Sequence, residues 1–194
     1  KVSSEDRTAI VKKFGLRERF FLYPGNFWPH KNHYRIVEAV GIIKQKHKVE
    51  IPIVFTGNDI PQWGVLSRCK SLAKRCSVES QLTCLGYVSD KELAALYEVA
   101  CGLVMPTYCG PTNIPYLEAF YHRCPVIAPD IPGDKEQVKD AAILINPKDS
   151  DAIASAMVAL WTDNNLRNEL IRRGEMRLTE LSPLNFRATL GAII

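Results

Sequence analysis

Short apolar runs recur along the chain, each of a length typical of a β-strand. They fall at residues 20–23, 53–56, 82–85, 103–106, 125–128 and 142–145. Their apolar character is nearly continuous, which indicates strands buried on both faces of a parallel sheet. The segments between them have helical spacing, as at Ile36, Val40 and Ile43. This alternation predicts an α/β protein with a Rossmann-like, doubly wound parallel sheet of about six strands and helices on both faces.

Capping signals support the helical part of this prediction. Ser89 is followed three positions later by Glu92, a capping-box pattern that predicts a helix ending near Ala100. Asp149 and Asp163 each precede another helical pattern. Since one set of alternating elements fills the 194 residues, the chain predicts a single domain.

Composition narrows the classes of protein. Apolar residues make up 46% and charged residues 24%, which is ordinary for a soluble globular protein, and no apolar run approaches the roughly 20 residues of a membrane helix. The first residues lack a signal-peptide pattern. The net charge of +4 does not indicate a nucleic-acid-binding protein, and the six cysteines form no Cys-x-x-Cys pair. We therefore expect a cytoplasmic protein with reduced thiols.

The loop after residues 103–106 carries the clearest chemical signal. Small and turn-forming residues, among them Gly110, Thr112, Asn113 and Ile114, separate this apolar run from a predicted helix that contains Glu118. Free backbone N–H groups and the positive end of the helix dipole suit a phosphate. The Glu118 carboxylate can then accept hydrogen bonds from a sugar hydroxyl. The alternative is an exposed first-turn acid stabilised only by the helix dipole.

The loop after residues 20–23 is the second candidate. It contains Gly25, Asn26 and Lys31, together with two histidines and a second asparagine. Lys31 precedes a predicted helix, where its charge can neutralise a diphosphate. The alternative is a solvated basic turn in which Trp28 packs against the core.

Other chemistries lack their patterns. His30 and His33 have no adjacent cysteine or acid, which argues against a zinc site. The glycine-rich P-loop and dinucleotide-binding motifs are absent, as is a recognisable Ser/His/Asp arrangement. We expect no metal cofactor.

Taken in order along the chain, these loops resemble those of the retaining family-4 (group 1) glycosyltransferases of the GT-B type. The family signature is Glu, seven residues, Glu; here Glu118 matches the second acid, whereas Gly110 stands at the first. Lys31 matches a lysine that contacts the donor diphosphate, and Asn26 stands where an arginine is usual. The resemblance extends from about residue 19 to residue 182.

The resemblance implies that residues 1–194 form the C-terminal, nucleotide-sugar-binding half of a GT-B fold, without the N-terminal acceptor domain. It implies catalytic roles for Lys31 and Glu118. It further implies a set of donor-binding residues: Gly25, Asn26, Val88, Asp90, Gly110, Thr112, Asn113, Ile114 and Glu118. Val88 and Asp90 belong to a loop that contacts the nucleotide base in the family.

The implied activity is transfer of a hexose from a GDP- or UDP-linked donor to a saccharide or lipid-linked acceptor. The anomeric configuration would be retained, no metal would be needed, and the full-length protein could associate peripherally with a membrane. Two alternatives remain open. One is a degenerate nucleotide-binding module, because Asn26 and Gly110 replace charged groups of the family. The other is a relative that acts as a sugar-nucleotide epimerase.

Overall fold

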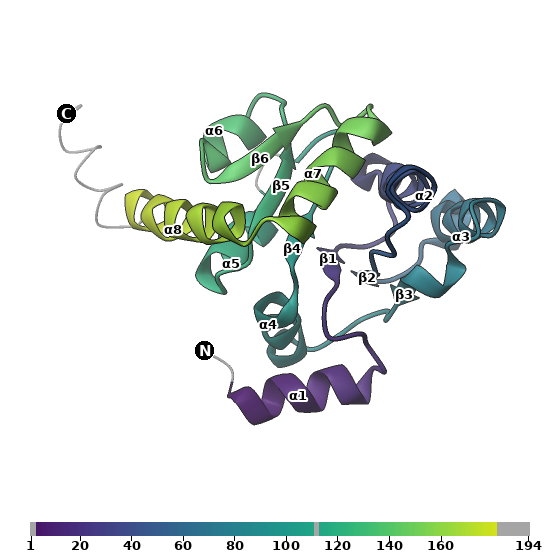
Figure 1. Ribbon diagram of the computed structural model, residues 1–194, viewed down its shortest axis with the longest axis horizontal. Coiled ribbons are helices and arrows are strands. Elements are labelled where there is room, and N and C mark those ends of the chain that lie inside the picture. The colour runs from purple at the N-terminus through teal and green to yellow at the C-terminus, as the bar shows by residue number, and fades with distance from the viewer. Residues whose placement is uncertain (1–2, 111–112, 182–194) are drawn as a thin grey trace.

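A parallel six-stranded sheet forms the centre of the computed structural model, which describes residues 3–110 and 113–181 (Figure 1). The strand order is β3-β2-β1-β4-β5-β6. The strands are β1 (Phe21–Pro24), β2 (Ile53–Thr56), β3 (Leu82–Cys84), β4 (Gly102–Val104), β5 (Val126–Pro129) and β6 (Ala142–Ile145). The predicted strands and fold class are confirmed, with some strand ends shifted by one or two residues.

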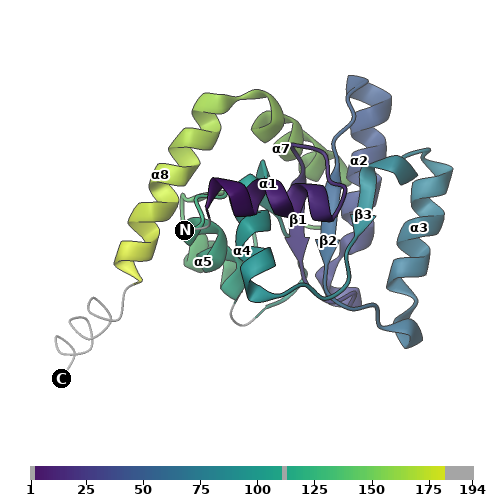
Figure 2. The same cartoon turned by 90° about the horizontal axis from the view of Figure 1, so that it is seen from below.

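Helices cover both faces of the sheet (Figures 1 and 2). On one face α2 packs between α3 and α7, and on the other α4 and α5 lie against the strands. α8 contacts both α5 and α7, and α1 lies along α4. The helices are α1 (Ser4–Lys13), α2 (His33–His47), α3 (Val65–Arg75), α4 (Asp90–Val99), α5 (Ile114–Tyr121), α6 (Asp134–Val138), α7 (Ser150–Thr162) and α8 (Asn164–Glu180). Short 3-10 turns span η1 (Pro29–Lys31), η2 (Pro61–Trp63) and η3 (Glu79–Gln81).

The predicted helix caps are confirmed. The Ser89 hydroxyl accepts a hydrogen bond from the Glu92 backbone N–H, and the Glu92 carboxylate accepts one from the Ser89 N–H at 2.7 Å. The Asp149 and Asp163 carboxylates cap α7 and α8 by accepting hydrogen bonds from backbone N–H groups of the first turn. Each cap satisfies backbone N–H groups that the first turn of a helix leaves unpaired.

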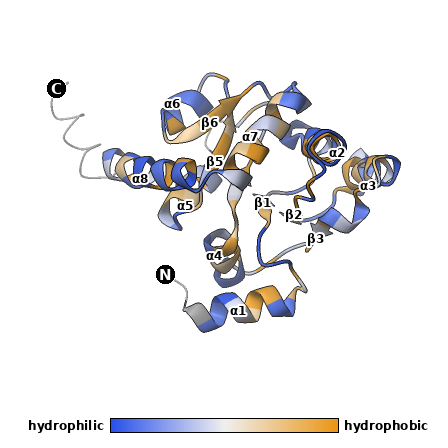
Figure 3. Ribbon diagram, viewed as in Figure 1, coloured by the Kyte–Doolittle hydropathy of each residue, from blue (hydrophilic) through white to orange (hydrophobic). Residues whose placement is uncertain are grey.

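The hydrophobic core lies where the central strands meet the inner faces of the helices (Figure 3). Phe21, Leu22 and Leu103 are fully buried on strands β1 and β4. The strand order reverses between β1 and β4, so the chain leaves these two strands toward opposite halves of the sheet. Ligands of doubly wound sheets bind at such a point, beyond the carboxyl ends of the strands.

Candidate functional site

The loops that follow β1 and β4 are hydrogen-bonded to each other. The backbone carbonyl of His30 accepts from the Thr107 hydroxyl at 3.0 Å and from the Tyr108 N–H at 2.9 Å. The next carbonyl, that of Lys31, accepts from the Tyr23 hydroxyl at 2.7 Å. The backbone around Lys31 is therefore fixed from two strands, at the edge where the sequence predicts the site.

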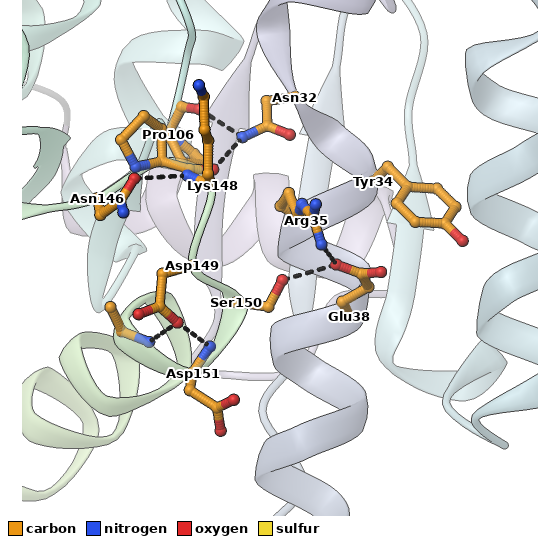
Figure 4. A network of polar contacts seen from close by, with 12 residues as sticks. Asn32, Tyr34, Arg35, Glu38, Pro106, Asn146, Lys148, Asp149, Ser150 and Asp151 are labelled. Carbon is orange, nitrogen blue, oxygen red and sulfur yellow. Dashed lines mark hydrogen bonds and ion pairs between the residues drawn. The ribbon is translucent and has the colours of Figure 1, made fainter.

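Asn32 is a second connection, one that sequence reasoning missed (Figure 4). Its backbone is left-handed, with φ 61°, a conformation that asparagine adopts more readily than most residues. Its amide donates to the carbonyls of Pro106 at 2.8 Å and Pro147 at 2.7 Å. Since Asn32 is buried, these bonds satisfy carbonyl groups that water does not reach. The sequence signal was an asparagine immediately before a helix.

Asn26 holds a neighbouring loop. Its side-chain oxygen accepts from the backbone N–H of Asn58 at 2.8 Å, just beyond β2. Gly57, beside Asn58, donates in turn to the carbonyl of Gly86 at 2.7 Å, beyond β3. The loops after β1, β2 and β3 are thus joined at one edge of the sheet. At the position where an arginine was expected, the chain has a structural amide.

His33, the first residue of α2, is enclosed by aromatic rings. Its imidazole stacks between Tyr23 and Phe27, with ring centroids 4.5 and 4.3 Å away, and Phe55 lies at 5.3 Å. Burial lowers the pKa of His33 to about 3, and the backbone of Gly25 opposes that shift only in part. The imidazole is therefore neutral near pH 7 and serves as a packing group.

This burial makes the stability pH-dependent. At pH values between the ordinary histidine pKa and about 3, the unfolded chain binds a proton at His33 that the folded chain does not. The free energy of unfolding therefore decreases as the pH is lowered through this range. From pH 7 to pH 5 we expect a loss of about 2 kcal/mol from His33. Urea unfolding at both pH values measures it. His33→Phe is expected to reduce the loss, whereas His47→Gln, at an exposed position, keeps it; equal losses in both variants would contradict the assignment.

Lys31 is half-buried at the end of η1. Burial lowers the pKa of its ammonium, and the Cys109 thiol and the Asp134 carboxyl act in the opposite direction. The pKa of His30 is lowered by burial and by the charge of Lys31. Lys31 is thus the principal cation of this loop, and its partial desolvation strengthens the attraction for an anion.

In the loop after β4, the Asn113 side chain occupies the space that a side chain at Gly110 would need. A Cβ added at Gly110 would lie 2.4 Å from Oδ1 and 2.6 Å from Nδ2 of Asn113. Asn113 is buried, and its backbone N–H and carbonyl are both bonded by the Gln137 side chain, at 3.2 and 3.0 Å. A larger residue at position 110 would require Asn113 to move. Of the other residues predicted in this loop, Thr112 lies outside the described residues, and Ile114 is exposed at the first position of α5.

Asp134, which the sequence did not single out, lies beneath this loop. Its Oδ1 accepts from Nδ2 of Asn113 at 2.5 Å and from the Tyr116 hydroxyl at 2.6 Å. Burial raises the pKa of its carboxyl, while Tyr116, Asn113 and Lys31 oppose the shift. The carboxylate is thus held by the residue before α5 and by α5 itself, and the charge of Lys31 acts on it.

Glu118 lies one turn into α5 and is half-buried. Its Oε2 accepts from the Tyr97 hydroxyl of α4 at 2.9 Å. Tyr97 is buried and stacks on His122 with centroids 5.8 Å apart. The carboxylate is therefore oriented by a neighbouring helix, which differs from the exposed first-turn acid considered above.

The predicted base-binding loop lies at the start of α4. The Val88 side chain is buried in the core, and Asp90 is exposed as the first residue of the helix. Gly86, at the other end of the loop, accepts the bond from Gly57 described above. Gly25, which follows β1 directly, donates its N–H to the carbonyl of Thr56 at 3.1 Å. The predicted residues thus come from loops at one edge of the sheet, whereas Glu118 faces α4.

Comparison with known proteins identifies the family. Residues 6–177 match the family described as glycosyl transferases group 1, and the chain belongs to this family. The O-antigen chain mannosyltransferase B of Escherichia coli is 27% identical over 174 residues, which are 89% of this chain and 45% of that protein. The family resemblance seen in the sequence is confirmed.

Solved structures share the fold. A glycosyltransferase from Rickettsia africae superposes with a TM-score of 0.85 at 18% identity, over 99% of this chain and 52% of that one. Anabaena HepE in complex with UDP gives 0.84 at 14% identity, over 99% and 53%. The chain therefore spans about half the length of these relatives. Within residues 3–110 and 113–181, no helix is both long and apolar enough to cross a membrane.

Proposed function

We propose that this chain is the donor-binding domain of a retaining glycosyltransferase. It would bind a nucleoside-diphosphate hexose, with GDP or UDP as the nucleotide, for transfer to a saccharide or lipid-linked acceptor. The observation that carries the proposal is the joining of the β1 and β4 loops at the switch point, with Lys31 beside them. Membership of the family, the mannosyltransferase relative and the UDP complex of HepE support it.

The contribution of this domain to the reaction is electrostatic. As the glycosidic bond to the diphosphate breaks, negative charge develops on the leaving oxygens. In this proposal the Lys31 ammonium and the N-terminal end of α5 stabilise that charge and replace a metal ion. The backbone at Lys31 and at Asn113, before α5, is held by hydrogen bonds within the chain. Glu118, oriented by Tyr97, would bind the ribose hydroxyls.

The acceptor side of the site is proposed to belong to an N-terminal domain outside these 194 residues. That domain would bind the glycan or lipid-linked acceptor and close the cleft against water. For the whole protein we propose a cytoplasmic location with peripheral membrane association. A lipid-linked acceptor would then be reached at the membrane surface.

Calorimetric titration of the chain with GDP, UDP, GMP and UMP tests the proposal. At least one diphosphate is expected to bind more tightly than its monophosphate, because its second phosphate adds an ionic interaction with the Lys31 ammonium. Affinity is expected to be weak while half of the cleft is missing. Equal binding of both members of each pair would contradict the donor-domain proposal.

A degenerate module is the second candidate, favoured by two observations. The Asn26 amide is engaged with Asn58, and the Asn113 side chain fills the space in front of Gly110. Neither position supplies the charge expected for a transferase. A screen of nucleotide sugars and acceptors with the full-length protein separates the candidates: nucleotide binding without transfer to any acceptor would favour the module.

The ribose role of Glu118 predicts a selective effect. Glu118→Gln is expected to weaken binding of a ribonucleotide by about 1.5–3 kcal/mol, the range for a hydrogen bond to a charged group, and to affect the 2′,3′-dideoxy analogue much less. Tyr97→Phe is the control for the orientation of the side chain, since it removes the internal hydrogen bond to Glu118 but keeps the carboxylate. If both variants weakened both nucleotides equally, Glu118 would be a packing residue.

A further inference from the structure

Asp134 carries a buried oxygen that lacks a donor. The residue is 1% exposed, and its Oδ1 is bonded to both Asn113 and Tyr116. No other residue in the described part of the chain donates a hydrogen bond to Oδ2. A buried carboxylate oxygen without a donor is costly, and native proteins rarely keep one outside functional sites.

The residues around this oxygen belong to the elements of the proposed donor site. Asn113, which binds Oδ1, is the residue that fills the space in front of Gly110. Lys31 is near enough to influence the Asp134 carboxyl electrostatically. The carboxylate is thus bonded at the start of α5 and is within the electrostatic influence of the lysine proposed to bind phosphate.

The two halves of a nucleotide sugar differ in what they offer this oxygen. The diphosphate presents hydrogen-bond acceptors, which a carboxylate repels. The hexose presents hydroxyl donors, and a charged acceptor out of water forms a strong hydrogen bond with a hydroxyl. Asn113 and Tyr116 hold the carboxylate in place, so its orientation does not have to be set by the ligand.

We propose that Oδ2 of Asp134 accepts a hydrogen bond from a hydroxyl of the transferred hexose, which makes Asp134 a sugar-recognition residue. The inference rests on the proposed donor-binding function. The hexose would enter below the β4 loop, next to Asn113, while the diphosphate stays at Lys31. Asp134 would then help to decide which hexose is accepted, because a hydroxyl of the wrong configuration leaves Oδ2 without a donor.

The test measures the gain in affinity that the sugar adds. The chain is titrated with GDP, GDP-mannose, UDP and UDP-glucose, and the ratio of the Kd of the free diphosphate to that of its sugar conjugate gives the gain. Asp134→Asn is expected to reduce the gain by about tenfold, the effect of one charge-assisted hydrogen bond, and to leave binding of the free diphosphate within about twofold. Asp140→Asn makes the same change of charge at an exposed carboxylate outside the site, and it is expected to retain the gain.

Two results would overturn the inference. One is an unchanged gain in Asp134→Asn; if diphosphate and conjugate are then weakened equally, the carboxylate acts through Lys31. The other is no gain with either sugar in the parent chain. Binding of free diphosphate tests the proposed function separately. Thermal unfolding checks that Asp134→Asn folds; if it does not, Asp134→Glu keeps the charge but moves the oxygen, and a changed gain with unchanged diphosphate binding supports the inference.

Discussion

Gly57→Ala is expected to lower the free energy of unfolding by about 3 kcal/mol or more. A Cβ at this position would lie 2.6 Å from the carbonyl carbon of Gly25 and 2.7 Å from the N of Asn26. Both are backbone atoms, so no side chain can move aside. Its φ of +99° adds strain for any residue with a Cβ. A left-handed backbone costs about 1–2 kcal/mol and overpacking about 1–3 kcal/mol, and the two effects add here.

Urea unfolding measures this change as a lower midpoint at an unchanged slope. Gly133→Ala is the matched control, because Gly133 has a φ of +85° but nothing within 4 Å of an added Cβ. The control is expected to lose only the conformational part, about 1–2 kcal/mol. If the two variants lost equal stability, the close approach of the β1 and β2 loops would not be a constraint.

Lys31→Ala is expected to weaken binding of a nucleoside diphosphate by about 1.5–3 kcal/mol, or roughly 10- to 150-fold. Binding of the monophosphate is expected to fall less. The fold is expected to survive, because the bond that Lys31 receives from Tyr23 ends on its backbone carbonyl, which alanine keeps. Calorimetry of the parent and the variant with both nucleotides gives the difference.

Lys74→Ala is the control for net charge, since Lys74 is exposed in the last turn of α3. It is expected to bind diphosphate like the parent. Raising the salt concentration is expected to reduce the difference between Lys31→Ala and the parent, because the lost interaction is ionic. A Lys31→Ala chain that bound diphosphate as tightly as the parent would identify the loop as a solvated basic turn.

The strands and most helices could be predicted because their signals are local. A continuous apolar run such as residues 53–56 reports its own burial, and a capping residue such as Ser89 acts within one helical turn. The helix α1 was missed because few of its described side chains are apolar and packed: Ile10 and the C-cap residue Phe14 lie against the core. Ion pairs such as Lys13 to Glu92 join it to α4, and these depend on a neighbour far along the chain.

The residues of the candidate site also divide into those with a local signal in the sequence and those whose contacts form only on folding. Lys31 and Glu118 could be predicted because a charged residue stands out in a loop or a first turn. Asn32 and Asp134 could not, because their roles arise from carbonyls and amides that approach only after folding. The surroundings of Gly110 could not be predicted either. The sequence showed that the acid of the family is replaced by glycine, and the structure shows that the Asn113 side chain lies where a side chain of residue 110 would be.

The bonds among the carboxyl-end loops bear on the entropy of binding. A loop that a ligand must order reduces the measured affinity, because freezing each side chain and backbone unit opposes association. Here the bonds from Asn26 to Asn58 and from Thr107 to His30 restrict the loops before any nucleotide arrives. That entropy loss belongs to folding, so with the proposed nucleotide ligand less of the binding enthalpy would be offset by ordering of the loops. This would allow half of a cleft to retain a measurable affinity for nucleotide in the absence of the other half.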